Sequence, residues 1–139
     1  MNERVIIAGS RTVFPSVQQI DDAIGKLGLT QQGDPEWDPM RWIEVISGRA
    51  PGADRAGEAW AKAKDKSLHF EPITKELIQQ YGKYLAPKMR NRRMAERGDR
   101  AIVFWDGTSS GTADMVCRMV ARGKPVAVIP WPKAKGVRR

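Results

Sequence analysis

The sequence of 139 residues contains one cysteine, Cys117, and one histidine, His69. One cysteine excludes an internal disulfide framework, and these two residues together cannot form a tetrahedral zinc site, so we expect no metal and no cofactor. The sequence also lacks an apolar run near the roughly 20 residues that a membrane-spanning helix needs, and it lacks a signal-peptide pattern. We therefore expect a cytoplasmic protein that has no membrane partner.

Acidic residues are absent after Asp114, whereas seven lysines and arginines follow it. A second basic cluster extends from Lys83 to Arg100 and is diluted only by Glu96 and Asp99. Over the whole chain 24 basic residues face 16 acidic ones, which gives a formal net charge of +8. Such clusters favour an anionic partner, either nucleic acid or a phosphorylated small molecule, but they are also compatible with a solvated surface.

The composition, with 41% hydrophobic and 29% charged residues, is typical of one soluble globular domain. We expect this domain to span residues 1–130, with a polar insertion at residues 29–41 that contains two prolines and a glycine. Residues 131–139 are expected to form a basic C-terminal tail.

Short runs rich in β-branched residues alternate with segments of helical spacing. The runs predict strands at Arg4–Ala8, Trp42–Ile46, Ser67–Phe70, Ala101–Trp105 and Pro125–Ile129. The helical spacing predicts helices at Val17–Leu27, Ala53–Lys66, Ile73–Tyr84, Pro87–Arg97 and Thr112–Arg122. Because the strands are apolar throughout, the pattern indicates an α/β fold, a three-layer sandwich with a mainly parallel sheet of about five strands.

Glycine-rich loops follow three of these strands, at residues 9–12, 47–54 and 106–112, and each precedes a helix. Glycine lets the backbone approach a ligand closely, and a helix start offers free N–H groups to phosphate. Ligands of parallel α/β sheets bind at the carboxyl ends of the strands, where these loops should meet. The candidate ligand-binding residues are Gly9, Ser10, Arg11, Ser47, Gly48, Gly52, Ala53, Asp54, Asp106, Gly107, Thr108, Ser109, Ser110, Gly111 and Thr112. None of the loops has the P-loop or the strict Gly-x-Gly-x-x-Gly spacing.

Four motifs carry a resemblance to a known family: VIIAGSR, VISGRAPGAD with GEAWA, RNRRM, and AIVFWDGTSSGTADM. In this order the chain from about Arg4 to Ile129 resembles the SLOG superfamily, and most closely its YspA-like, YpsA-related branch. The resemblance implies a Rossmann-like fold whose glycine loops bind nucleotides or nucleotide-derived ligands, in a homodimer or a higher homo-oligomer. Relatives include the lonely-guy phosphoribohydrolases and the DNA-binding protein DprA.

The resemblance also places Arg90 and Asn91 at the ligand, because they match an Arg-Asn pair of the family. The position of the catalytic glutamate of the lonely-guy enzymes is occupied by Met115, and a carboxylate stands one residue earlier, at Asp114. One residue rotates a helical side chain by about 100°, so Asp114 should face elsewhere. Arg90 and Asp114 are nevertheless the candidate catalytic residues if the protein is an enzyme.

Three functions therefore stay open. The leading one is binding of an ADP-ribose-like or cyclic nucleotide, to sense, sequester or process it. The second is N-glycosidic cleavage of nucleoside monophosphates, with Arg90 and a carboxylate from Asp114, Asp106 or Glu58. The third is binding of nucleic acid, as in DprA.

Several side chains have an ordinary structural interpretation. Trp60 and Trp105 are expected in the core or at its rim, with base stacking as the alternative. We expect Asp54 and Glu58, one helical turn apart, to be a solvated pair. Core positions are also expected for four residues of the last helix and for its cysteine, namely Met115, Val116, Met119, Val120 and Cys117. Exposed tryptophans at positions 37, 42 and 131 would suit a subunit contact.

Overall fold

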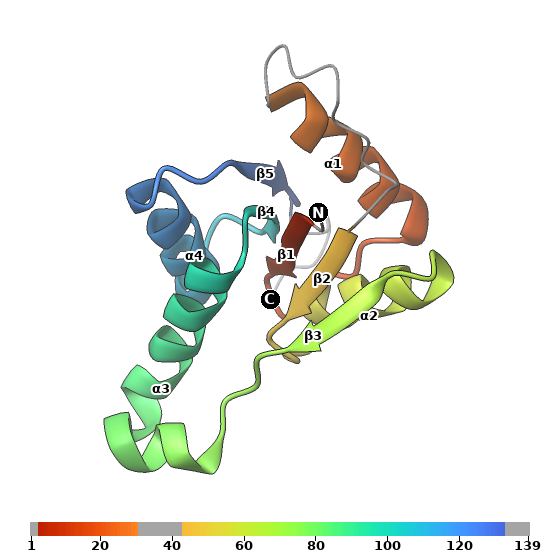
Figure 1. Ribbon diagram of the computed structural model, residues 1–139. Helices are drawn as coiled ribbons and strands as arrows, with labels where there is room; N and C mark the ends of the chain where they lie inside the picture. The colour runs from red at the N-terminus through yellow and green to blue at the C-terminus, as the bar shows by residue number, and fades with distance from the viewer. Residues whose placement is uncertain (1–2, 31–42, 133–139) are drawn as a thin grey trace, which may run out of the picture.

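The computed structural model describes residues 3–30 and 43–132, which form five strands and four helices (Figure 1). The strands are β1 (Glu3–Gly9), β2 (Ile43–Ser47), β3 (Ser67–Phe70), β4 (Arg100–Trp105) and β5 (Val126–Pro130). The helices are α1 (Val17–Thr30), α2 (Ala53–Ala63), α3 (Lys75–Arg97) and α4 (Ser110–Ala121). All strand pairs are parallel and the order is β3-β2-β1-β4-β5, which confirms the predicted Rossmann-like α/β fold.

The sheet lies between two helical layers, α1 with α2 on one face and α3 with α4 on the other (Figure 1). The sequence of β1 explains this, because its four central residues are all buried and point alternately to the two faces. Val5 and Ile7 pack in the core beneath α1 and α2, whereas Ile6 and Ala8 pack in the core beneath α3 and α4. The continuous apolar run is therefore the signature of a strand covered on both sides.

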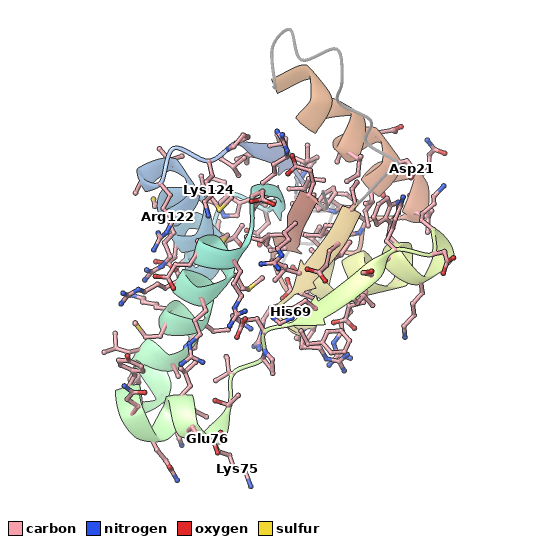
Figure 2. All side chains as sticks on the ribbon, viewed as in Figure 1. Asp21, His69, Lys75, Glu76, Arg122 and Lys124 are labelled. Carbon is pink, nitrogen blue, oxygen red and sulfur yellow. The ribbon has the colours of Figure 1, made fainter. Side chains whose placement is uncertain are left out.

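The first core contains the largest buried side chain, Trp60 of α2, which is fully inaccessible. Its indole Nε1 donates to Asp21 Oδ1 of α1 at 2.8 Å, and Lys64 Nζ lies 3.0 Å from the other oxygen of that carboxylate (Figure 2). Trp131 closes the same core, with its ring 5.9 Å from that of Phe104 in an edge-to-face arrangement. The packed part of the chain thus includes Trp131, the first residue of the segment predicted to form the basic tail.

Helix α4 corrects two of the expected core positions. Met115 and Met119 are buried against the sheet and Val116 is partly buried, as expected. Val120, however, is 63% exposed and Cys117 is also exposed. The apolar stripe of this helix is narrower than its composition suggests, because a helix at the edge of the sheet buries only one row of side chains.

Helix α3 is broken by a kink at Gly82, whose φ of 82° and ψ of 168° are not helical. This agrees with the expectation of a broken helix or two consecutive helices over this segment. The first half begins at Thr74, whose hydroxyl accepts from Leu77 N, and it projects beyond the sheet (Figures 1 and 2). At the other end, Lys124 Nζ binds the carbonyl oxygens of Ala95 and Gly98, each at 2.7 Å.

The expected insertion and tail lie largely outside the described residues. Helix α1 continues to Thr30, three residues beyond its predicted end, and residues 31–42 and 133–139 are not described. In the described part of the chain, no helix has the length and apolar character needed to span a bilayer.

Candidate functional site

The loops after β1, β2 and β4 meet because these three strands are neighbours with the same direction. They surround an open pocket of about 290 Å³, at the lower end of the range of small-molecule sites. Eight of the predicted site residues line it: Gly9, Arg11, Asp54, Arg90, Asn91, Ser109, Gly111 and Thr112. The other lining residues are Ala8, Ala50, Ile73, Pro87, Met94 and Met115.

The loop after β2 is packed closely against its neighbours. Gly52 has a φ of 82°, and a Cβ at this position would lie 2.4 Å from the backbone oxygen of Arg11. A Cβ on Gly48 would lie 2.7 Å from Arg90 Nη1 and 2.9 Å from Asp54 Oδ2. Neither glycine lines the pocket, but together they let two charged side chains reach it.

Asp54 stands in the first turn of α2 and is only 5% exposed. Its Oδ2 accepts from Ala50 N at 3.2 Å, whereas the N-cap residue of the helix, Gly52, offers no side chain. Burial raises the pKa of Asp54 to about 6, although the Ala50 amide and the Arg90 charge oppose the shift. The carboxyl group therefore exchanges its proton near neutral pH, a property found at many active sites.

Two guanidinium groups face the pocket with this carboxyl group. Arg90 Nη1 donates to Gly48 O at 2.5 Å and Nε donates to Asn91 Oδ1 at 3.2 Å. Burial lowers the pKa of Arg90, Asp54 raises it, and Arg11 lowers it again by repulsion. Because the positive charges of Arg11 and Arg90 repel each other in a partly desolvated pocket, an anion bound between them would be stabilised.

The loop after β4 is divided between turn and pocket. Asp106 accepts from the backbone nitrogens of Thr108 and Ser109, both at 2.9 Å, and these hydrogen bonds lower its pKa to about 2. Asp106, Gly107 and Thr108 thus build an Asp-Gly turn and do not line the pocket. Ser109 does line it and also caps α4, because its hydroxyl accepts from Thr112 N.

The remaining predicted loop residues support this arrangement from outside the pocket. Ser10 is buried; its hydroxyl accepts from Asp106 N and its carbonyl accepts from Ala53 N, which joins the three loops. Ser47 is buried and donates to Glu58 Oε2 at 2.6 Å. Ser110 is exposed and does not line the pocket.

Asp114 does not line the pocket, and the structure gives it other partners. Its Oδ2 accepts from Asn91 Nδ2 at 3.1 Å and from Arg118 Nε at 2.9 Å. Met115 lines the pocket in its place, as the helical rotation predicts. Asn91 also donates to Gly111 O at 3.2 Å, so it connects α3 to the start of α4. The catalytic assignment of Asp114 therefore loses its geometric basis.

The expected solvated pair is buried, which is a correction. Asp54 is 5% and Glu58 7% exposed, because this face of α2 turns toward β2. Glu58 Oε1 binds Arg49 Nη1 at 3.0 Å, and Arg49 in turn lies over the Phe70 ring, 4.4 Å from its centroid. Sequence reasoning missed this contact because Arg49 lies in the loop after β2, whereas Phe70 is the last residue of β3.

One wall of the pocket was also missed. The pocket lining includes four apolar residues that were not predicted, Ile73, Pro87, Met94 and Met115. Trp60 is fully buried in one core and Trp105 packs at the rim of the other, as expected. The alternative, stacking on a base, is not favoured, because neither tryptophan lines the pocket and Trp105 donates its Nε1 to Ser109 O at 3.0 Å. The predicted helix over Pro87–Arg97 falls within α3, but the residue spacing did not indicate which of its residues border the pocket.

Many basic side chains of α3 and α4 are paired within the protein. Arg92 and Arg122 both bind Glu96, Arg97 binds Glu71, and Arg118 binds Asp114. These ion pairs reduce the excess charge that this surface presents.

Comparison with solved structures shows which known protein has a similar fold. Over 99% of its length this chain superimposes on a solved α/β structure with a TM-score of 0.66. That structure is DNA processing protein A (DprA) from Streptococcus pneumoniae, which is 17% identical and of whose chain 53% is covered. The present chain thus spans about half the length of this neighbour. Neither the protein-family models nor the curated proteins gave a match. At this identity the likeness shows a shared fold, in agreement with the parallel α/β architecture described above.

Proposed function

We propose that the protein binds a nucleotide or nucleotide-derived signalling ligand, ADP-ribose-like or cyclic, in the pocket formed by the three glycine loops. The observation that carries the proposal is the meeting of Arg11 and Arg90 in one partly desolvated pocket beside the N-terminus of α4. Two guanidinium groups beside the positive end of a helix dipole suit a phosphate. The ligand could then be sensed, sequestered or processed.

The other lining residues suit the rest of a nucleotide. Asp54 is the one carboxylate among the described lining residues, and a carboxylate beside a phosphate site suits a sugar hydroxyl, which donates to it. The apolar side with Met94 and Met115 suits a base, because methionine sulfur packs favourably against aromatic rings. In this arrangement phosphate, sugar and base each meet a different chemistry.

Calorimetry with AMP, cyclic AMP and ADP-ribose tests this function. We expect at least one of them to bind below millimolar, and Arg90→Ala to weaken that binding by about 10–100-fold, as loss of a charged hydrogen-bonding partner does. Arg11→Ala is a second variant, on an exposed residue whose loss should not disturb the fold. Arg92→Ala is the matched control, since Arg92 lies on the same helix, is exposed and pairs with Glu96. A folded protein that binds none of the three ligands would contradict the proposal.

Asp54 favours a second candidate, N-glycosidic cleavage of a nucleoside monophosphate. Water would add to C1′ while the C1′–N bond breaks; the carboxylate takes a proton from the water and the departing base receives one, leaving ribose 5-phosphate and free base. A carboxyl pKa of about 6 suits both proton transfers. Chromatography should then detect free base with the parent protein and at least 100-fold less with Asp54→Asn, which should still bind AMP. Equal base release by both proteins would exclude this role of Asp54.

Nucleic-acid binding is the third candidate, supported by the net charge of +8 and by the likeness in fold to a DNA processing protein. If phosphate contacts dominate, affinity for single-stranded DNA should fall steeply with salt and weaken when residues 132–139 are removed. Homo-oligomer formation is likewise a proposal, to be tested by light scattering. Trp131 does not favour it because its ring packs inside the domain, and Trp37 and Trp42 lie outside the described residues.

A further inference from the structure

Arg49 lies beside the pocket, with an uncommon backbone conformation and a side chain that is held by two contacts. Its φ of 67° lies in the left-handed region, which costs a residue other than glycine free energy. Ion pairing fixes the guanidinium at Glu58, and the ring of Phe70 supports it from below. Strain that is held in place by several contacts is often found at functional sites.

The anchor of this arrangement is buried. Glu58 is 7% exposed, and its second oxygen accepts from Ser47 Oγ at 2.6 Å, so the carboxylate is fixed by both partners. The two residues it supports remain accessible: the Arg49 side chain is 36% exposed and Phe70 is 43% exposed. The Arg49 guanidinium thus lies over the Phe70 ring while both side chains are partly open to solvent, and we call this pair the Arg49–Phe70 platform.

The platform adjoins the proposed nucleotide pocket. Ala50 lines the pocket directly after Arg49, and Ile73 lines it three residues after Phe70. Glu71 N also binds Ser47 O at 2.8 Å, which ties the end of β3 to the loop after β2. A pocket of about 290 Å³ is small for a ligand with two nucleotide units, so the second unit would have to lie outside it.

We propose that the Arg49–Phe70 platform is a second subsite, on which the base of a second nucleotide unit stacks when the first unit occupies the pocket. This inference rests on the proposed nucleotide binding and names the ligand class more closely, as a dinucleotide-type ligand with two bases. Guanidinium planes and phenyl rings are common stacking partners of exposed bases. The positive charge of Arg49 also suits the phosphate that joins the two units.

The test compares AMP with the 5′-phosphorylated dinucleotide pApA by calorimetry. We expect the parent protein to bind pApA about tenfold more tightly than AMP, as stacking of one base on such a partner allows. Arg49→Lys keeps a positive charge opposite Glu58 but has no flat group, and Phe70→Leu keeps the apolar bulk without the ring. Each should reduce the pApA preference to about twofold or less and leave AMP affinity unchanged.

The control is Phe14→Leu, which removes an exposed ring, 67% accessible, from the loop after β1 without touching the platform. It should leave the preference for pApA intact. A merely structural role of Arg49 and Phe70 would change both affinities by the same factor, and this outcome would overturn the inference. Equal affinity of the parent protein for AMP and pApA would also overturn it while leaving the proposed function standing. Binding of neither ligand would remove both.

Discussion

The loops after β2 and β4 both lead from a buried strand into a helix at the pocket, yet different interactions hold them. The loop after β2 is held by tertiary contacts, with Gly52 against the Arg11 backbone and Asp54 and Glu58 buried beneath it. The loop after β4 is held mainly by its own side chains, through the turn of Asp106 and the cap of Ser109, with an added hydrogen bond from Asp106 N to Ser10 Oγ. A glycine-rich loop can therefore be either a close-packed part of a site or a locally stable turn beside it.

This difference has an electrostatic counterpart. Asp54 sits at the start of α2, where the helix dipole favours the carboxylate, but burial outweighs that effect and raises its pKa to about 6. Asp106 is only partly buried, and backbone donors lower its pKa to about 2. Of the two aspartates, only Asp54 can change charge near neutral pH, so the loop after β2 carries the proton chemistry of the site.

The largest expected effect is a difference in unfolding free energy between two variants, each with alanine in place of one glycine in one of the two loops. Gly52→Ala adds a Cβ 2.4 Å from a backbone oxygen at a φ of 82°, so it should cost about 3–5 kcal/mol of unfolding free energy. Gly107→Ala, at a φ of 87° with nothing within 4 Å, should cost only about 1–2 kcal/mol. Urea denaturation measures both. Similar losses would show that the loop after β2 can relax around the added methyl group.

The second prediction concerns the pH dependence of stability. Because the pKa of Asp54 rises from 3.8 in the unfolded chain to about 6 in the folded protein, its ionisation costs stability as pH rises from 4 to 6. Asp54→Asn removes this titration, so the variant should gain about 3 kcal/mol relative to the parent protein between pH 4 and pH 7. Denaturation of both proteins at several pH values gives the difference. A difference independent of pH would mean that Asp54 titrates normally.

The five strands, their parallel direction and the sheet edge that carries the candidate pocket could be predicted from the sequence, because continuous apolar runs alternate with helical segments. The order of the strands within the sheet was not predicted. The spacing of Asp54 and Glu58 correctly indicated one shared helical face. It could not indicate whether that face turns to solvent or to the sheet, since charged residues point outward in most helices. The buried orientation is stable because Ser47 and Arg49, which β2 brings to this face, bind the Glu58 carboxylate and offset the cost of its desolvation.

The apolar residues that line the pocket could not be predicted from the sequence, for a related reason. Of these residues, Ile73 lies in the connection between β3 and α3, and Pro87 lies in α3 after the kink at Gly82. Periodicity within a helix predicts which residues share a face, but the path between elements depends on backbone angles that residue spacing does not encode. The same holds for the Arg49–Phe70 contact, which joins the ends of two strands.

A smaller effect is expected from the cap of the loop after β4. Ser109→Ala removes the acceptor for Thr112 N, so it should cost about 1 kcal/mol of unfolding free energy. Ser110→Ala is the matched control, because Ser110 is exposed and does not cap the helix; its cost should stay within about 0.5 kcal/mol. Helix α2 has no such side-chain cap, which is why its loop depends on tertiary contacts. If both variants cost the same, the serine cap does not hold this loop.

The smallest effect is expected at Asp114, whose place in the motif suggested catalysis. Asp114→Asn keeps an acceptor for Asn91 Nδ2 and Arg118 Nε, and the residue does not line the pocket. AMP affinity and any base release should therefore change less than about twofold, whereas Asp54→Asn should abolish base release. Both variants remove one negative charge, so a difference in base release between them reflects the position of the carboxylate and not the loss of charge. A loss of base release with Asp114→Asn alone would mean that the ligand-bound protein rearranges the start of α4, because in the present geometry Met115 lines the pocket and Asp114 does not.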